Sequence, residues 1–286
     1  MSGRSSLMDR RALFSSAAAA TLLAATGVSA AVLPKRGGRL RMALSGASRG
    51  DSWLRGDGLF MQVARQGLVF DTLTEVAADG TLRGELATGW RALDNGHRWV
   101  FDLRQDVTFH DGRPFTAADV IASAAGFGGG QVDAIGRYQV SFLLDRADIG
   151  FPMRLAQPEF YISPAHALGE GIGTGLYRVK SFTPGQRLLT ERVTTHYKDG
   201  VAGWFDEVEL TSIPAEPVRG QAIAEYLVDA VDLKDARLVS GIEDVRLQPN
   251  RRQPAHAVSA SVAQPAKVSH LRPLDNLRAA ERWWFA

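Results

Sequence analysis

Several short stretches of the chain alternate apolar and polar residues, which is the pattern of half-buried β-strands. Phe101 and Leu103 alternate with polar neighbours, and residues 138–144 follow the same pattern. Asp94-Asn95-Gly96 is a favoured turn sequence, so residues 90–103 are expected to form a hairpin. A second hairpin is predicted around Pro184-Gly185, and the remaining expected strands are 40–44, 208–213 and 230–233.

Helices are indicated by end signals and by a longer apolar period. Thr116 stands three residues before Asp119, a capping box that predicts a helix start. Asp111-Gly112, just upstream, predicts a tight turn with a left-handed residue. A short helix is expected at 60–66 and an amphipathic one at 218–228. Strands and helices mixed without strict alternation favour an α/β or α+β lobe.

Composition narrows the class of protein. The chain has 286 residues, 45% of them apolar, which supports a sizeable core and excludes global disorder. Three of the 33 basic residues and one of the 31 acidic ones precede Ala31, so the remainder carries 30 of each. A nucleic-acid partner therefore has no support from charge. Cysteine is absent, which excludes disulfides, thiol nucleophiles, cysteine-bound metals and a lipid-anchored cysteine.

The first 30 residues have the pattern of an export signal. Arg10-Arg11 is followed by an Ala/Leu-rich apolar run to Gly27, and Val28-Ser29-Ala30 fits the small-residue cleavage rule. We predict a signal peptide of the twin-arginine type over residues 1–30. The mature protein is then expected free in the periplasm, without a lipid anchor. The alternative is an uncleaved anchor, although the apolar run is short and Ala-rich for a membrane span.

The stretch from Asp102 to Val120 resembles the signature of solute-binding protein family 5, the dipeptide- and oligopeptide-binding proteins of bacterial ABC importers. Those proteins read LR-x-x-V-x-FHDG-x-PFTA-x-DV at this place, and the same letters occur here from Leu103 onward. Further blocks resemble the family in the same order: Gly67-Leu-Val-Phe-Asp-Thr-Leu73, Gly80-Thr-Leu82, Glu85-Leu-Ala-Thr-Gly-Trp90, Gly173-Thr-Gly-Leu-Tyr177, Pro184-Gly-Gln-Arg187, Phe205-Asp-Glu-Val208 and Ile213-Pro214.

This resemblance implies a type II periplasmic-binding-protein-like fold, essentially its first lobe only. The family-like lobe is expected over residues 31–233, followed by a Pro/Arg/Ala-rich tail over 234–286. The tail ends in the aromatic cluster Trp283-Trp284-Phe285. That cluster is expected either to dock on the lobe or to form a contact surface for a partner or a second copy of the chain.

Catalytic constellations are not found in the sequence. His110 beside Asp111 belongs to the family's turn, and we interpret the pair as structural. His97, His166, His196, His256 and His270 lack metal-ligand spacing. The letters G-x-S-x-G occur at Gly46-Ala47-Ser48-Arg49-Gly50, but we do not expect a nucleophile elbow there, and Gly126 to Gly130 does not read as a phosphate loop. Trp90 and Trp99 are expected in the core. The sequence therefore predicts a non-enzymatic binding protein without catalytic residue, metal or cofactor.

By resemblance, the ligand contacts of the first lobe come from the loop after the first strand, residues 45–59. Trp53 is predicted to offer an apolar wall, and Asp51 or Asp57 a counter-charge to a ligand amine. The predicted binding set is completed by Ser45, Tyr161 and Thr174. The alternative is that each is an ordinary loop residue.

The expected ligand is a small peptide or similar solute, and the expected partner is an ABC permease in the inner membrane. Because the family also includes nickel, haem and sugar binders, the resemblance leaves the ligand open. The alternative function is a single-lobe periplasmic interaction protein that has lost transport.

Overall fold

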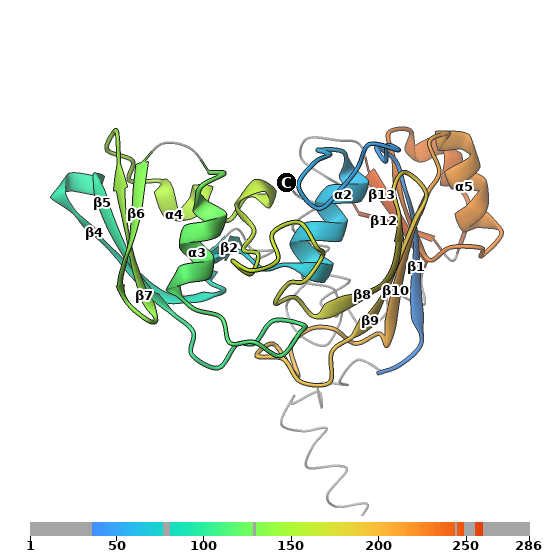
Figure 1. The fold of residues 1–286 in the computed structure, drawn as a ribbon. Coiled ribbons are helices and arrows are strands. Elements are labelled where there is room, and N and C mark those ends of the chain that lie inside the picture. The colour runs from blue at the N-terminus through green and yellow to red at the C-terminus, as the bar shows by residue number, and fades with distance from the viewer. Residues whose placement is uncertain (1–35, 77–80, 128–129, 244, 249–254, 260–286) are drawn as a thin grey trace, which may run out of the picture. The chain divides into compact units, whose positions relative to one another are not determined.

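The computed structural model describes residues 36–76, 81–127, 130–243, 245–248 and 255–259. The predicted signal peptide and the aromatic cluster Trp283-Trp284-Phe285 lie outside these residues. The described residues form a mixed α/β fold with three β-sheets, which confirms the predicted fold class (Figure 1). None of their helices is both long and apolar enough to cross a membrane.

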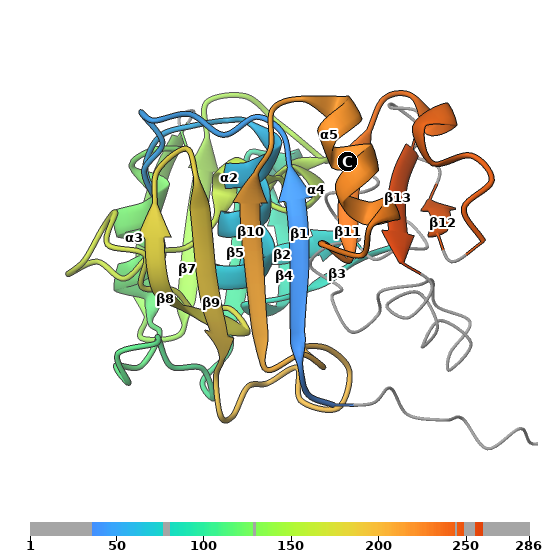
Figure 2. The same cartoon turned by 90° about the vertical axis from the view of Figure 1, so that its right-hand side faces the viewer.

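The largest sheet has seven strands in the order β12-β13-β11-β1-β10-β9-β8 (Figure 2). The central strand β1 runs parallel to both β10 and β11, and the other pairs are antiparallel. The strands are β1 (Arg39–Leu44), β8 (Tyr177–Thr183), β9 (Arg187–Arg192), β10 (Glu207–Ser212), β11 (Ala230–Leu233), β12 (Val245–Gln248) and β13 (Ala255–Ser259).

The predicted strands and the hairpin around Pro184-Gly185 are confirmed within this sheet. Gly185 has φ 73° at the turn. Two strands lie beyond Leu233, in the segment that we predicted from the sequence to be a tail. There β13 pairs with β11, and β12 pairs with β13.

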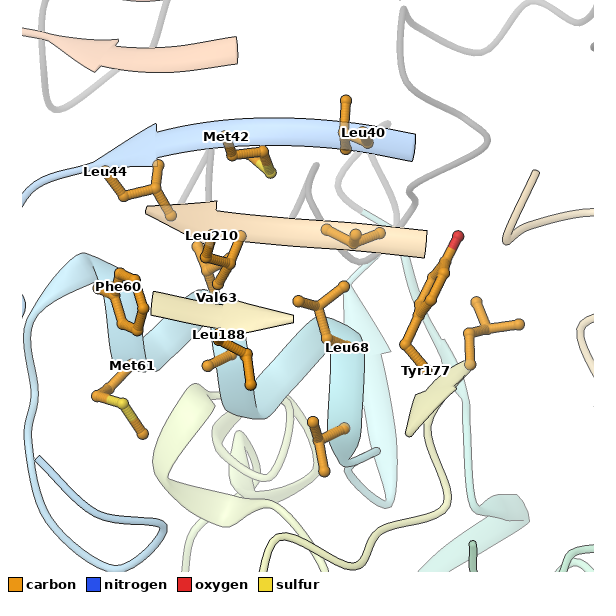
Figure 3. Close-up of a cluster of buried hydrophobic side chains, with 14 of the residues drawn as sticks. Leu40, Met42, Leu44, Phe60, Met61, Val63, Leu68, Tyr177, Leu188 and Leu210 are labelled. Atoms are coloured by element: carbon orange, nitrogen blue, oxygen red, sulfur yellow. The ribbon is translucent and has the colours of Figure 1, made fainter. Parts of the chain in front are cut away.

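One face of the sheet is covered by the helix α2 (Leu59–Val63) and the segment η1 (Ala64–Val69) that follows it, in which the helical backbone breaks at Gln66 and Gly67. Figure 3 shows the apolar side chains of the strands meeting those of this helix. Leu40, Met42 and Leu210 from the strands are 0–1% exposed, as are Phe60 and Met61 from the helix. Full burial of one such side chain contributes about 1.5–3 kcal/mol, so this cluster holds the helix and the segments at its ends in place.

The other face of β8, β9, β10 and the first half of β1 is charged, because the alternate residues of these strands are basic and acidic. Arg39 pairs with Glu207 at 2.6 Å, Arg187 with Glu209 at 2.7 Å, and Lys180 with Glu207 at 3.0 Å. Exposed pairs of this kind contribute roughly 0–1 kcal/mol each. The alternation, rather than the ion pairs, fixes which face is buried.

Helix α5 (Glu216–Ala224) is shorter at its end than the predicted span of 218–228. The apolar residues Leu227 and Val228 continue the helical pattern, but Tyr226 adopts a left-handed backbone with φ 58°. The amides of Tyr226 and Leu227 bond to the carbonyls of Ile223 and Ala222, which is the Schellman arrangement. The predicted end is therefore wrong because a C-cap closes the helix without glycine.

The second sheet has four strands in the order β4-β5-β7-β6, and β2 pairs with β3 in a small hairpin. The predicted hairpin is confirmed as β4 and β5, with left-handed residues at Asp94, Asn95 and Gly96. Trp99 is 6% exposed and Trp90 packs partly buried on the same core. The bounds are β2 (Thr74–Val76), β3 (Leu82–Gly84), β4 (Ala87–Leu93), β5 (Arg98–Leu103), β6 (Gly130–Gly136) and β7 (Gln139–Leu144).

The remaining helices are short. The capping box is confirmed: the Thr116 amide donates to the Asp119 carboxylate at 2.8 Å, and α3 (Ala117–Ala124) follows. The others are α4 (Phe151–Arg154) and the 3₁₀ turns η2 (Asp94–Gly96), η3 (Pro158–Phe160) and η4 (Ala236–Val239).

Gly112 forms the predicted left-handed turn, with φ 85° and open space around the position of a side chain. We expect Gly112→Val to lower the free energy of unfolding by about 1–3 kcal/mol, because a β-branched residue is strained in this region. Gly136→Val is the matched control, since its site is equally open and has no positive φ. Urea unfolding should show less than about 0.5 kcal/mol for the control. Equal effects of the two variants would contradict the backbone explanation.

Candidate functional site

The loop over residues 45–58 leaves the carboxyl end of β1 and leads into α2. The carboxyl ends of β10 and β11 lie at the same edge of the sheet, because both strands are parallel to β1. In open α/β sheets, ligands bind in the crevice outside the carboxyl ends of parallel strands. The loop that we predicted from the sequence to contact the ligand therefore lies at the position in the fold where a binding site is expected.

A buried ion pair forms the base of this edge. Arg219 is 2% exposed and Asp232 is 6% exposed, and their side chains meet at 3.2 Å. Arg219 also donates to the carbonyls of Ile213 and Pro214 at 2.7 and 2.9 Å, just beyond the end of β10. Asp232 accepts the amide and the hydroxyl of Ser45 at 2.8 and 2.7 Å. The pair thus ties the ends of all three parallel strands together, and the Ser45 hydroxyl is used in that network.

Two glycines close the loop above this base. The Phe60 amide donates to the Ser45 carbonyl at 3.2 Å, so the two ends of the loop meet. A Cβ atom added to Gly58 would lie 1.8 Å from the Gly46 carbonyl oxygen, and Gly46 itself has φ 79°. Only residues without a side chain allow this approach. The result is a compact Ω-loop, a class of loop that is frequently functional.

The two predicted carboxylates differ in what they face. Asp51 is 5% exposed and accepts the Ser48 amide at 2.8 Å, so its charge is turned into the loop. Asp57 is exposed, and its backbone carbonyl accepts Gln62 Nε2 at 2.6 Å. Of the two, Asp57 is the one that can meet a ligand amine without rearrangement of the loop.

The two apolar residues of the loop also differ. Trp53 is 7% exposed and packs on Phe182 with ring centroids 4.9 Å apart. The indole covers Gly171, where an added Cβ would lie 2.5 Å from the ring nitrogen. Leu54 is 63% exposed, beside Gly169. The apolar side chain that the loop offers to solvent is therefore Leu54, which sequence reasoning did not select.

Tyr161 and Arg65 hold the loop by donating hydrogen bonds to its backbone carbonyls. The Tyr161 hydroxyl donates to the Trp53 carbonyl at 2.6 Å. Arg65 donates to the carbonyls of Ser52 at 2.7 Å and Gly56 at 2.5 Å, and also to that of Arg55. Burial raises the pKa of Tyr161 and lowers the pKa of Arg65. Arg65 was not selected from the sequence. The signal that could have identified it is the single arginine within the mostly apolar segment 59–69.

Thr174 belongs to a different, buried ionic cluster. Its hydroxyl donates to Asp71 at 3.0 Å. Lys198 Nζ lies 3.5 Å from Asp71 and 3.4 Å from Glu75, and it also pairs with the fully buried Glu85. Burial alone would raise the pKa of Asp71, but the nearby charge of Lys198 holds that pKa well below its usual range. The structure thus brings Ser45, Asp51, Trp53, Asp57 and Tyr161 to the loop, whereas Thr174 lies in the ionic cluster.

His110 is held by the backbone on both sides of its ring. The Gly173 amide donates to Nδ1 at 3.3 Å, and Nε2 lies 2.8 Å from the Gly175 carbonyl. Burial lowers the pKa of His110. These contacts agree with the structural interpretation of the His110-Asp111 turn. Among the described residues, no group of three or more His, Asp and Glu side chains is arranged to hold a metal ion.

Residues 81–253 match the family model described as "Bacterial extracellular solute-binding proteins, family 5 Middle". A curated relative, the probable D,D-dipeptide-binding periplasmic protein DdpA of Escherichia coli, is 28% identical over 246 residues, which are 75% of this chain and 46% of that protein. The nickel-binding periplasmic protein of Escherichia coli is 39% identical over 56 residues, which are 20% of this chain and 11% of that protein.

Two solved structures share the fold. The binding protein AgaA of A. tumefaciens R10, in complex with agropinic acid, superposes with a TM-score of 0.67 at 23% identity, covering 73% of this chain and 47% of that one. The oligopeptide-binding protein AppA of Bacillus subtilis, in complex with a nonapeptide, gives 0.64 at 20% identity, covering 75% and 48%. The chain therefore spans about half the length of these solved structures and less than half of the curated relatives named above.

Proposed function

Because this chain belongs to the bacterial extracellular solute-binding proteins of family 5 and has the type II periplasmic-binding-protein fold, we propose that it binds a short peptide or a related small solute for an ABC-type importer. The observation that carries the proposal is the closed loop 45–58 at the carboxyl edge of β1, β10 and β11. Structures of the same fold hold a nonapeptide and the peptide STSA, which supports a peptide as the ligand class.

In this proposal the loop supplies one wall of the binding site. Peptide-binding clefts use backbone hydrogen bonds for affinity and side-chain pockets for selectivity. The exposed Asp57 carboxylate is placed to attract a ligand amine, and Leu54 offers an apolar contact. Binding alone is proposed, with transport carried out by an ABC permease in the inner membrane.

Native mass spectrometry of the protein isolated from the periplasm tests the ligand class directly. We expect a bound mass that fragments as a short peptide, and Asp57→Asn should weaken rebinding of that peptide about tenfold, which corresponds to ~1.4 kcal/mol. Asp133→Asn is a matched control, an exposed aspartate on β6. A bound nickel complex or sugar would contradict the peptide assignment. Protein that carries no ligand and binds none would favour an interaction role instead.

Export by the twin-arginine route is a separate part of the proposal, and it concerns residues outside the described ones. We expect changing both Arg10 and Arg11 to lysine to block appearance of the mature protein in the periplasmic fraction, because that route reads the arginine pair. Changing Arg4 to lysine is the control and should leave export intact. Unchanged export of the double variant, measured by fractionation, would contradict the route while leaving the periplasmic destination standing.

A further inference from the structure

Four backbone carbonyls at the tip of the loop are held by two side chains. Ser52, Arg55 and Gly56 accept from the guanidinium of Arg65, and Trp53 accepts from the Tyr161 hydroxyl. The guanidinium also lies over the Tyr161 ring, 5.8 Å from its centroid. Arg65 and Tyr161 thus act on one short segment of the loop from the same side.

That segment is a tight reversal. The amides of Ser52 and Arg55 donate to each other's carbonyls, both at 3.1 Å, which leaves Trp53 and Leu54 at the turn. Trp53 points into the core, whereas Leu54 is 63% exposed. Arg65 therefore holds carbonyls on both sides of the turn, that of Ser52 before it and those of Arg55 and Gly56 after Leu54, while Tyr161 holds the Trp53 carbonyl.

The chemistry of arginine suits this position. A guanidinium is a rigid planar fork of five N–H donors, so a single side chain can serve several carbonyls, whereas lysine is a point charge on a flexible stem. The helical backbone breaks directly after Arg65, where Gln66 has ψ 61° and Gly67 has φ 169°, and the Phe70 amide bonds to the Arg65 carbonyl at 2.8 Å across the break. Arg65 is therefore the last residue before the break, and its side chain reaches the loop from there.

We infer that Arg65 is a positioning residue, which holds the Ser52–Arg55 reversal so that Leu54 contacts an apolar side chain of the bound solute. This inference rests on the proposed function for its last step, the contact with solute. The other part of the inference, that Arg65 holds the loop, does not depend on a bound solute. A preformed loop loses less conformational freedom on binding than a loose one, so Arg65 would raise affinity without touching the ligand.

Amide hydrogen exchange of the full chain without ligand tests the positioning role. We expect Arg65→Lys to speed exchange at the Ser52 and Arg55 amides at least tenfold, while the amides of β1 change less than twofold. Arg187→Lys, an arginine in an exposed pair on the charged face of the sheet, is the control and should change neither. Unchanged exchange in Arg65→Lys, or equal acceleration in the loop and in β1, would overturn the inference.

Calorimetry with trileucine and trialanine tests the contact of Leu54 with solute. We expect both Arg65→Lys and Leu54→Ala to weaken trileucine binding about tenfold and trialanine binding less than threefold. Equal losses for the two peptides, or none, would overturn the assignment of Leu54. If the unchanged protein binds neither peptide, the proposed peptide function fails, and the exchange result still decides whether Arg65 positions the loop.

Discussion

Replacing Lys198 with methionine is expected to lower the free energy of unfolding by about 3–5 kcal/mol, because the change removes the ammonium group that pairs with three buried carboxylates. Lys198 is 8% exposed, and Glu85, its nearest partner, is fully buried. Asp71 and Glu75 lie within 3.5 Å of the same ammonium group. These contacts join the β2–β3 region to the segment before β10, so their loss affects parts of the chain that are far apart in sequence.

The loss should depend on pH in a defined direction. The folded-state pKa of Asp71 is depressed, so its contribution to stability is present above the unfolded value of about 3.9 and is lost as the pH falls below it. Without Lys198, the largest cause that lowers the pKa of Asp71 is lost, and only the contacts with His196 and Glu85 still act against the effect of burial. Protonation of Asp71 would then stabilise the variant. The difference in free energy of unfolding between the variant and the unchanged protein should therefore narrow between pH 7 and pH 5.

Urea unfolding at the two pH values measures both effects. Lys180→Met is the matched control, since Lys180 pairs with Glu207 and Glu191 on the exposed face of the sheet. That variant should lose less than about 1 kcal/mol. If Lys198→Met were no more destabilised than Lys180→Met, the buried cluster would not contribute to stability as argued.

Elements set by local signals could be predicted from the sequence. The Asp94-Asn95-Gly96 turn, the Thr116 capping box and the Pro184-Gly185 turn each depend on a few neighbouring residues. Alternation located β1 and β10 to within one residue, because one face of each strand is buried. Family resemblance then supplied the arrangement that local patterns do not contain. The end of α5 could not be predicted, since Tyr226 takes a conformation usually given to glycine.

The loop that carries the candidate site could be predicted from the sequence, but the directions of its side chains could not. Its loop follows β1 as expected, yet Asp51 and Trp53 are turned inward, and Thr174 belongs to the ionic cluster. A polar or aromatic residue in a loop does not reveal which way its side chain points. The residues that decide this, Arg65 and Tyr161, come from elsewhere in the chain, and Tyr161 lies 108 residues from the Trp53 carbonyl that it holds. Gly46 and Gly58, at the two ends of the loop, were the local signal of a closed loop.

Arg219→Met is expected to destabilise the fold by about 3–5 kcal/mol and to loosen the candidate site at the same time. The change leaves the Asp232 carboxylate buried with only the Ser45 donors, and it removes the hydrogen bonds to Ile213 and Pro214. Asp232→Leu should cost a similar amount, because Arg219 then keeps a buried charge without its counter-ion.

The double variant Arg219→Met with Asp232→Leu distinguishes the interaction between the two side chains from the cost of leaving one charge buried alone. Replacing both partners by apolar residues removes both charges, so we expect it to be at least 1 kcal/mol more stable than the two single losses added together. Urea unfolding of the four proteins gives this coupling energy. Amide exchange should also rise at Ser45 in the two variants that lack Asp232, because the Ser45 amide donates to that carboxylate. Strictly additive losses with unchanged exchange at Ser45 would mean that the ion pair neither couples the strand ends nor anchors the loop that follows β1.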